Sequence, residues 1–133
     1  MYEYNVKKVI KVVDGDTIDV DIDLGFKISY TQRVRLAGID TPESRTKDLR
    51  EKALGLEVKN KVKNAIDSAK TIVIKTELPD STEKYGRILG WVYLDNSLKS
   101  LNEQLIDEGY AWGYMGKTKV KDFDALLAKR VGK

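Results

Sequence analysis

The sequence contains neither cysteine nor histidine among its 133 residues. Without them the chain has no disulfide, no thiolate nucleophile, no zinc site of the cysteine–histidine kind and no histidine-dependent catalytic triad. A bound metal would therefore be a hard cation held by oxygen atoms. A carboxylate is the expected general base, and arginine, lysine or a metal would stabilise any developing negative charge.

Long apolar segments are also absent. No stretch approaches the roughly 18 residues that a membrane span needs. The N-terminal residues MYEYNVKKVIKVVDGDT contain neither the apolar run nor the small-residue cleavage site of a signal peptide. The sequence as it stands predicts a cytoplasmic protein that does not enter a membrane, and secretion would require a leader removed before this numbering begins. Lysine and arginine outnumber aspartate and glutamate by 24 to 21, and the net charge of +3 permits a polyanionic partner without requiring one.

Period-two alternation of apolar residues predicts five β-strands. They are expected at residues 4–13, 17–23, 27–36, 71–77 and 88–94. In the second strand, Ile18, Val20 and Ile22 share one face and should point into the core. In the third strand, Ile28 and Val34 should do the same. Short turns rich in Asp and Gly separate the first three strands, which makes them a β-meander.

Helical periodicity appears between and after these strands. Apolar residues at three- and four-residue spacing predict a long amphipathic helix over residues 50–69. Shorter helices are expected at 101–109, which Ser100-Leu-Asn-Glu103 opens as a capping box, and at 123–129. This order predicts an α+β, mainly β, protein with a single domain over residues 1–133, built as a five-stranded OB-fold barrel with about three helices. Because that fold binds nucleic acids, sugars and peptides alike, it does not determine an activity.

An acidic run in the second strand imitates a calcium-binding loop. Asp19, Asp21 and Asp23 follow the D-x-D-x-D pattern of an EF-hand. However, Gly25 comes one residue too late for that loop, and Tyr30 stands where a bidentate glutamate is needed. The three aspartates are therefore expected to form the solvated face of an amphipathic strand.

Three other segments concentrate residues that could carry chemistry. The turn Asp14-Gly15-Asp16 suits either ordinary turn chemistry or a metal ligand. Residues 33–43, RVRLAGIDTPE, put two arginines on one face of a strand and follow them with a carboxylate-bearing loop that a proline stiffens. A rigid loop at a strand end is a common position for catalytic groups, although arginine beside carboxylate is more often a surface ion pair of little energy. Residues 83–87, EKYGR, offer two cations and a phenol, and would also suit a solvated loop.

Taken together, the three segments resemble the staphylococcal nuclease (thermonuclease) family. The strings that carry the resemblance are Val13-Asp14-Gly15-Asp16-Thr17, Arg35-Leu36-Ala37-Gly38-Ile39-Asp40-Thr41-Pro42-Glu43 and Lys84-Tyr85-Gly86-Arg87. Each motif alone is weak, but the three occur in the expected order with a β–α–β pattern between them. The resemblance runs from about Lys8 to Ala111 and fades after Tyr110.

The resemblance implies a calcium-dependent phosphodiesterase that hydrolyses DNA and RNA. Water would attack phosphorus, the P–O5′ bond would break, and 3′-phosphates would be left. The implied metal ligands are the carboxylates of Asp16 and Asp40 and the backbone carbonyl of Thr41. One Ca²⁺ ion is the cofactor that the family implies, while Mg²⁺ suits the same ligands.

The resemblance also implies roles for groups that contact the substrate. Arg35 and Arg87 would grip the scissile phosphate, and Glu43 would position or deprotonate the attacking water. Lys84 and Tyr85 would contact the neighbouring terminal phosphate. These roles agree with elementary chemistry, because a phosphodiester repels nucleophiles until its negative charge is neutralised, and the guanidinium fork matches two phosphate oxygens.

Aromatic residues near the C-terminus could bind bases. Tyr110, Trp112 and Tyr114 occur together, and Tyr114 is the expected stacking platform for a base. One or two of these rings could instead close the end of the barrel. The basic residues of the tail could track phosphates, although a solvated helix face is favoured for them.

Two alternatives to a metal-dependent nuclease stay open at this point. One is a non-catalytic OB-fold module that binds nucleic acid, and the other is an OB domain that binds a protein or peptide and whose acidic turn is only structural. The joint presence of Arg35, Glu43 and Arg87 favours the enzyme. For the enzyme we expect a monomer that acts on DNA, RNA or both, as single strands or frayed ends.

Overall fold

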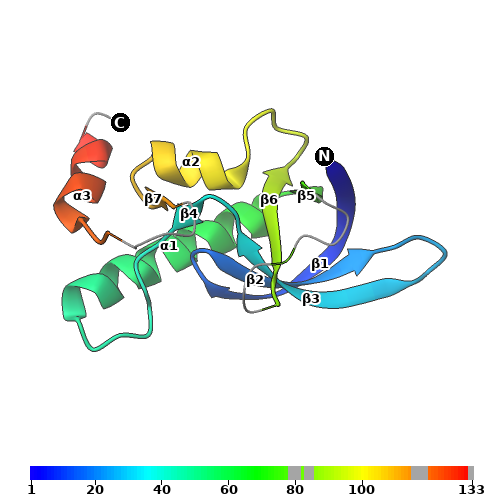
Figure 1. Ribbon diagram of the computed structural model, residues 1–133, viewed down its shortest axis with the longest axis horizontal. Coiled ribbons are helices and arrows are strands. Elements are labelled where there is room, and N and C mark those ends of the chain that lie inside the picture. The colour runs from blue at the N-terminus through cyan, green and yellow to red at the C-terminus, as the bar shows by residue number, and fades with distance from the viewer. Residues whose placement is uncertain (78–81, 83–85, 115–119, 132–133) are drawn as a thin grey trace.

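The computed structural model of the chain describes residues 1–77, 82, 86–114 and 120–131. Figure 1 shows a barrel with helices on one side and along one end. The elements are β1 (Tyr2–Asp14), β2 (Thr17–Asp23), β3 (Ser29–Leu36), β4 (Ile39–Asp40), α1 (Leu49–Ser68), β5 (Ile72–Thr76), β6 (Ile88–Leu94), α2 (Leu101–Asp107), β7 (Trp112–Gly113) and α3 (Phe123–Val131). None of the helices in these ranges is long and apolar enough to cross a membrane.

Five strands form a closed barrel in the order β1-β2-β3-β6-β5, and β5 returns to pair with β1. All neighbours are antiparallel except β3 and β6, which run parallel. Three register shifts in β1 mark bulges. Since bulges bend and twist a strand, β1 can follow β2 along its length and also pair with β5 at its N-terminal end. The prediction of an α+β, mainly β, OB-type barrel with three helices is confirmed for the described part of the chain.

The core fills the barrel and the space between the barrel and α1. Ile18, Val20 and Ile22 are buried as their alternation predicts, and Val34 is fully buried. The α1 residues that complete this core recur at four-residue spacing: Leu54, Val58, Val62 and Ile66. Burial of such a stripe is the main source of helix stability in a protein, because propensity alone barely sustains a helix.

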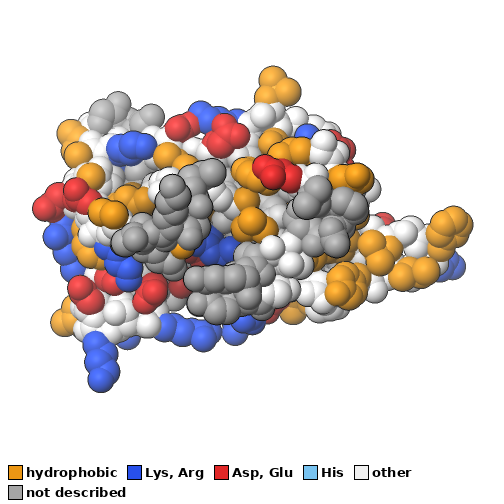
Figure 2. All heavy atoms as spheres, viewed as in Figure 1, with side chains coloured by type: hydrophobic (Ala, Val, Ile, Leu, Met, Phe, Trp, Pro, Cys, Tyr) orange, Lys and Arg blue, Asp and Glu red, His pale blue; other side chains and the backbone are white. Residues whose placement is uncertain are grey.

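The prediction that Ile28 faces the core is wrong. Ile28 is 56% exposed and lies just before β3 begins, in a hairpin that extends beyond the barrel (Figure 1). Among the described residues, no other layer covers this tip. Leu24 and Phe26 are exposed there as well, and Figure 2 shows the hydrophobic side chains along the arm. Alternation therefore predicts which residues share a face, but not how far along the strand the covering layer extends.

A short sheet at one end of the barrel was not predicted. β4 pairs with β7 antiparallel, with Asp40 opposite Trp112. The N–H of Tyr114 extends the pairing by donating to the carbonyl of Gly38, at 2.8 Å. The fully buried Asn102 of α2 fixes the chain ahead of β4, because its Nδ2 donates to the carbonyl of Ala37 at 2.8 Å. These contacts determine where β4 places its last residue.

Candidate functional site

Three charged side chains that are distant in sequence meet where β3 ends. Nη2 of Arg35 lies 3.4 Å from Oδ2 of Asp16 and 3.5 Å from Oδ1 of Asp40, and the three side chains are only 9%, 12% and 7% exposed. Strand register explains the meeting. Thr17 pairs with Arg35 across β2 and β3, and β4 begins three residues after β3 ends. Nη1 of Arg35 also donates to the carbonyl of Leu36 at 2.8 Å, which holds the guanidinium in place.

The carboxylate of Asp16 is oriented by its neighbours. Its Oδ1 accepts from the hydroxyl of Thr17 at 2.9 Å, and its Oδ2 accepts from the N–H of Thr41 at 3.3 Å. The turn that carries it rests directly on α1, because a Cβ at Gly15 would lie 2.6 Å from Cγ1 of Val58. Only glycine allows so close an approach, so the Asp-Gly-Asp motif serves packing as well as chemistry.

A second carboxylate, that of Asp14, lies close enough to Asp16 for their charges to interact. Burial raises the pKa of Asp14, and the nearby carboxylate of Asp16 raises it further, while a hydrogen bond with Ser44 partly offsets both effects. Within the described residues, one carboxylate oxygen of Asp14 and the buried hydroxyl of Thr41 have no hydrogen-bond partner. Carboxylates in this environment are stabilised by added positive charge.

The donor set fits a hard divalent cation. The carboxylates of Asp16 and Asp40 both contact one positively charged nitrogen, so they already converge around positive charge. No cluster of three acidic side chains with metal-ligand spacing occurs in the ranges that the structure describes. A cation here would therefore complete its coordination with carbonyl and water oxygens, as Ca²⁺ and Mg²⁺ commonly do.

Glu43 occupies a loop that is attached to α1. Its carboxylate is half exposed, while its N–H donates to Oε2 of Glu51 at 3.1 Å. A Cβ at Gly55 would lie 2.4 Å from the carbonyl carbon of Glu43, so the loop backbone lies against the helix. The structure thus presents the side chain of Glu43 towards solvent from a fixed backbone.

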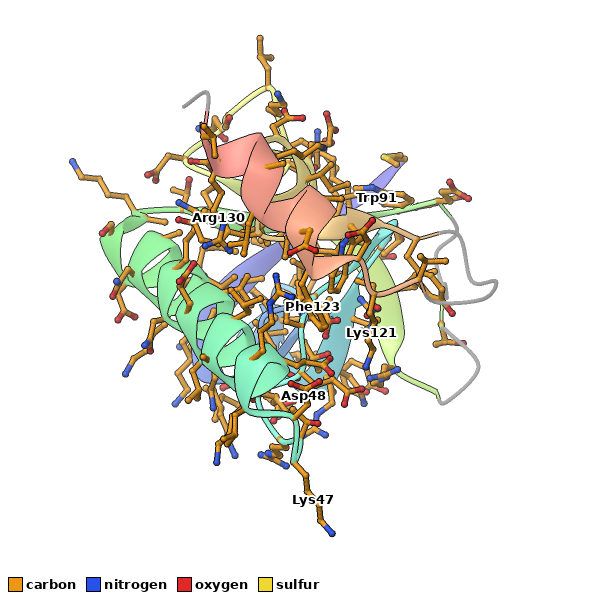
Figure 3. All side chains as sticks on the ribbon, turned by 90° about the vertical axis from the view of Figure 1, so that its left-hand side faces the viewer. Lys47, Asp48, Trp91, Lys121, Phe123 and Arg130 are labelled. Carbon is orange, nitrogen blue, oxygen red and sulfur yellow. The ribbon has the colours of Figure 1, made fainter. Side chains whose placement is uncertain are left out.

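Two residues beside Glu43 were not identified from the sequence as parts of a site. The buried carboxylate of Glu51 accepts from Nζ of Lys121 at 2.9 Å, and the same Nζ lies 3.8 Å from Oε1 of Glu43. The hydrogen bond with Glu51 raises the pKa of Lys121, and the charge of Glu43 adds to this. Figure 3 shows Lys121 near the first turn of α3. It lies towards the N-terminal end of α1, where Asp48 is labelled.

A local signal for one of these residues exists in the sequence. Asp48 and Glu51 have the spacing of a capping box, and Asp48 does cap α1 by accepting from the N–H groups of Arg50 and Glu51. Glu51, however, accepts from the loop N–H of Glu43. The contact with Lys121 joins residues 70 positions apart, and no local pattern reveals it.

Arg87 lies just before β6, the strand that pairs with the strand of Arg35. In β6, Ile88 pairs in parallel with Val34 and Leu89 pairs with Arg35. Extending the alternation of strand side chains by one residue puts Arg87 on the same side of β6 as Leu89. The topology therefore brings the segment of Arg87 to the strand of Arg35 rather than to the opposite wall of the barrel.

Of the three expected substrate-binding residues, the structure describes one. Lys84 and Tyr85 lie outside the described residues. Tyr114 is half-buried beside β4 through its backbone bond to Gly38. Trp112 packs on Phe123 with ring centroids 5.6 Å apart, and its indole N–H donates to a backbone carbonyl.

Tyr110 also has a packing role. Its ring contacts the cationic groups of Lys61 and Arg130, which lie 4.7 and 4.1 Å from the ring centroid. The ring packs against the barrel core as well. Tyr110 and Trp112 are thus held by contacts within the fold, and stacking of a base on Tyr114 stays a prediction.

The aspartates that imitate an EF-hand form cross-strand and turn contacts. Asp19 and Arg33 face each other across β2 and β3 in a two-pronged ion pair of 2.7 and 3.1 Å. Asp21 accepts from the hydroxyl of Thr31, and Asp23 accepts from a turn N–H. This arrangement is that of an exposed, hydrogen-bonded strand face, in agreement with the sequence analysis.

Fold and site together define a class: OB-type barrels with a charged site, suited to an anion and a hard cation, where β3 ends. Within that class, the chain belongs to the family described as staphylococcal nuclease homologue, whose model matches residues 33–130. The family resemblance inferred from the sequence motifs is therefore confirmed.

The chain is similar to several curated proteins of this kind. The thermonuclease of Staphylococcus hyicus is 37% identical over 106 residues, which cover 78% of this chain and 56% of that protein. The micrococcal nuclease of Shigella flexneri is 32% identical, with 80% and 57% covered. An uncharacterized protein of Methanocaldococcus jannaschii is 30% identical, with 91% and 65% covered. The chain thus spans between about half and two thirds of the length of these relatives.

Proposed function

We propose that the protein is a nuclease, a hydrolase that cleaves phosphodiester bonds of DNA, RNA or both. One observation carries the proposal. The fixed guanidinium of Arg35 lies between the carboxylates of Asp16 and Asp40 in a member of the staphylococcal nuclease family. A phosphodiester is an anion that repels nucleophiles, so a site that combines arginine with cation ligands lowers the barrier to attack.

Arg35 and Arg87 bind the scissile phosphate in this proposal. Arg35 is held by its contacts through Nη1 and Nη2, so little side-chain freedom remains to be lost when an anion binds. Arginine suits this role because its planar fork matches two phosphate oxygens. Both guanidinium groups then stabilise the extra negative charge that develops on the phosphate oxygens in the transition state.

Glu43 positions the attacking water and accepts its proton. The half-exposed carboxylate can reach solvent, while the bond from its N–H to Glu51 and the contact with α1 at Gly55 fix the loop. Nζ of Lys121 lies 3.8 Å from Oε1 of this carboxylate. With no histidine in the chain, a carboxylate is the available base.

A hard divalent cation fits beside these groups. Asp16, Asp40 and the backbone carbonyl of Thr41 would hold it, with Ca²⁺ implied by the family resemblance and Mg²⁺ suited to the same oxygens. When bound, such a cation supplies positive charge that polarises the phosphate. The proposal includes 3′-phosphate products, contacts from Lys84 and Tyr85 to a neighbouring phosphate, and stacking of a base on Tyr114.

The direct test measures cleavage of plasmid DNA, single-stranded DNA and RNA with Ca²⁺, with Mg²⁺ and with chelator. We expect cleavage that depends on the cation and leaves 3′-phosphate ends. Glu43→Gln should lower turnover by about 10²–10⁴-fold while leaving DNA binding nearly unchanged. Asp19→Asn, on the exposed strand face, is the matched control and should retain activity.

The outcomes separate the alternatives. A folded protein that binds DNA but cleaves nothing with any divalent cation would be a non-catalytic binding module. A folded protein that neither binds nor cleaves nucleic acid would point to the peptide-binding alternative. Equal loss of binding and turnover in Glu43→Gln would contradict the role of Glu43 as base.

A further inference from the structure

A second charged feature lies between β1 and α1, outside the acid–arginine cluster. The two elements enclose an open groove of about 480 Å³. Its lysines are Lys7, Lys8, Lys11, Lys59, Lys63 and Lys70, and Asp67 is the single acidic residue that lines it. Apolar side chains of both elements form the rest of the lining. The positive charges of the groove therefore lie beside apolar walls of low dielectric constant, which strengthens their attraction for an anion.

Helix geometry and a bulge bring these lysines together. On α1, Lys59 and Lys63 are four residues apart and so share one helix face, while Lys70 follows just after the helix ends at Ser68. Lys7 and Lys8 are neighbours in a strand, where alternation would send them to opposite faces. The register shift between Val6 and Lys8 interrupts that alternation, and both lysines line the groove.

The charge of the groove is concentrated rather than typical of the surface. Six lysines face one aspartate here, whereas the whole chain has an excess of only three positive charges. The rest of the molecule is therefore net acidic. In the part of the chain that the structure describes, none of the six lysines forms an ion pair. The charge of Lys11 interacts with that of Asp19 beyond ion-pair distance, and Asp19 is already paired with Arg33.

The groove starts beside the candidate active site. Val12, at one end of its lining, is four residues before Asp16. The turn that carries Asp16 rests on Val58, where Gly15 meets the helix, and Val58 is the neighbour of Lys59. From Lys59 to its last residue, Ser68, the helix then advances by about 14 Å. The turn of Asp16 thus joins one wall of the groove through β1 and rests on the helix that forms the other.

We propose that this groove binds the phosphate backbone of the nucleic-acid substrate, several nucleotides away from the bond that is cleaved. The inference rests on the proposed function, since it adds a subsite to that substrate. Lysine ammonium groups are mobile point charges without the fork that reads base edges. The groove therefore binds without regard to sequence, and its contribution falls steeply with salt because counterions are released from the nucleic acid.

The first test measures binding, with no turnover involved. Fluorescence anisotropy follows a labelled single-stranded DNA of about 30 nucleotides on the Glu43→Gln protein over a series of salt concentrations. The double variant Lys59→Gln/Lys63→Gln removes two groove charges, and Lys27→Gln/Lys99→Gln removes two charges elsewhere. We expect the groove variant to reduce the slope of log K against log salt by about 1.4, and the control to leave it unchanged. Equal slopes in the two variants would overturn the proposal.

The second test compares substrate lengths in the active protein. A trinucleotide fills the acid–arginine cluster but is too short to extend along the groove. We expect Lys59→Gln/Lys63→Gln to keep the parent's kcat/KM on the trinucleotide and to raise KM on the long strand. An equal loss on both substrates would assign the lysines to the catalytic site and reject a separate subsite. If no cleavage occurs at all, the proposed nuclease function fails. The binding test still shows whether the groove binds nucleic acid.

Discussion

Gly55 sets how closely the loop of Glu43 can approach α1. Alanine in a helix is ordinarily more stable than glycine by about 1 kcal/mol. Here the added Cβ would lie 2.4 Å from the carbonyl carbon and oxygen of Glu43 and 2.6 Å from the N of Ser44, and backbone atoms cannot rotate away as side chains do. We expect Gly55→Ala to lower the free energy of unfolding by about 1–3 kcal/mol and to reduce turnover by displacing Glu43.

Denaturant unfolding and steady-state cleavage measure the two effects. Lys52→Ala, at an exposed position of the same helix, is the control and should change neither by much. A gain in stability for Gly55→Ala would show that the loop moves away freely and that its contact with the helix does not fix the site.

The ion pair between Asp19 and Arg33 gives the exposed strand face a pH dependence. The hydrogen bonds from Arg33 lower the pKa of Asp19 below its ordinary value of 3.8. Stability from the pair is therefore fully present above that value and is lost as the pH falls through the lowered pKa. We expect Asp19→Asn to lower the free energy of unfolding by about 0.2–1 kcal/mol at neutral pH.

Urea unfolding from neutral pH down to about pH 2 follows this difference between variant and parent. The difference should shrink to nothing once Asp19 is protonated in the folded parent. A difference that persists at the acid end would show that the asparagine acts through packing or strand pairing rather than through charge.

At the scale of elements, three ion pairs join α1 to α3 and to the segment just before it. Arg50 pairs with Asp124, Arg130 pairs with Glu57, and Lys121 pairs with the buried Glu51. The first two pairs are exposed and contribute little, whereas Lys121 neutralises a carboxylate that is only 6% exposed. The C-terminal segment thus supports the loop that carries the candidate base.

Removing this cation tests that support. We expect Lys121→Met to lower the free energy of unfolding by about 1–2 kcal/mol, because Glu51 is left buried without its partner. Glu51→Gln in the same chain should restore part of the loss, so a double-mutant cycle by denaturant unfolding should show clear coupling. Additive losses would mean that Lys121 and Glu51 do not act as a pair.

Periodicity predicts the long elements well, but it does not predict the short ones that complete the site. β6 spans the predicted residues 88–94, and α1 differs from the predicted 50–69 by one residue at each end. β4 and β7 have two residues each, which is too short for any alternation to show. They form because Asn102 and the backbone of Tyr114 hold the chain there, and such contacts depend on the finished fold.

At the scale of the whole molecule, the family motifs predict more than the local patterns do. No spacing rule shows that Arg35 meets Asp16 and Asp40, because that meeting depends on the register of β2 and β3 and on the turn into β4. The family resemblance names these residues through their order in the sequence. It does not name Glu51 or Lys121, whose contacts arise where the C-terminal segment returns to α1.

The charge pattern around Asp16 links cation binding to the stability of the whole fold. Burial and the charge of Asp16 raise the pKa of Asp14, so the folded state stores repulsion between these carboxylates that a bound cation would relieve. A ligand that binds only the folded state at about 100 times its Kd stabilises the fold by about 2.7 kcal/mol, or roughly 10 °C in Tm. We therefore expect Ca²⁺ to raise the Tm by that order and chelator to reverse the rise. Asp16→Asn should abolish the rise, while Asp19→Asn should retain it, since Asp19 is paired with Arg33 on the exposed strand face. A rise of equal size in both variants would place the cation elsewhere and remove Asp16 from its ligands.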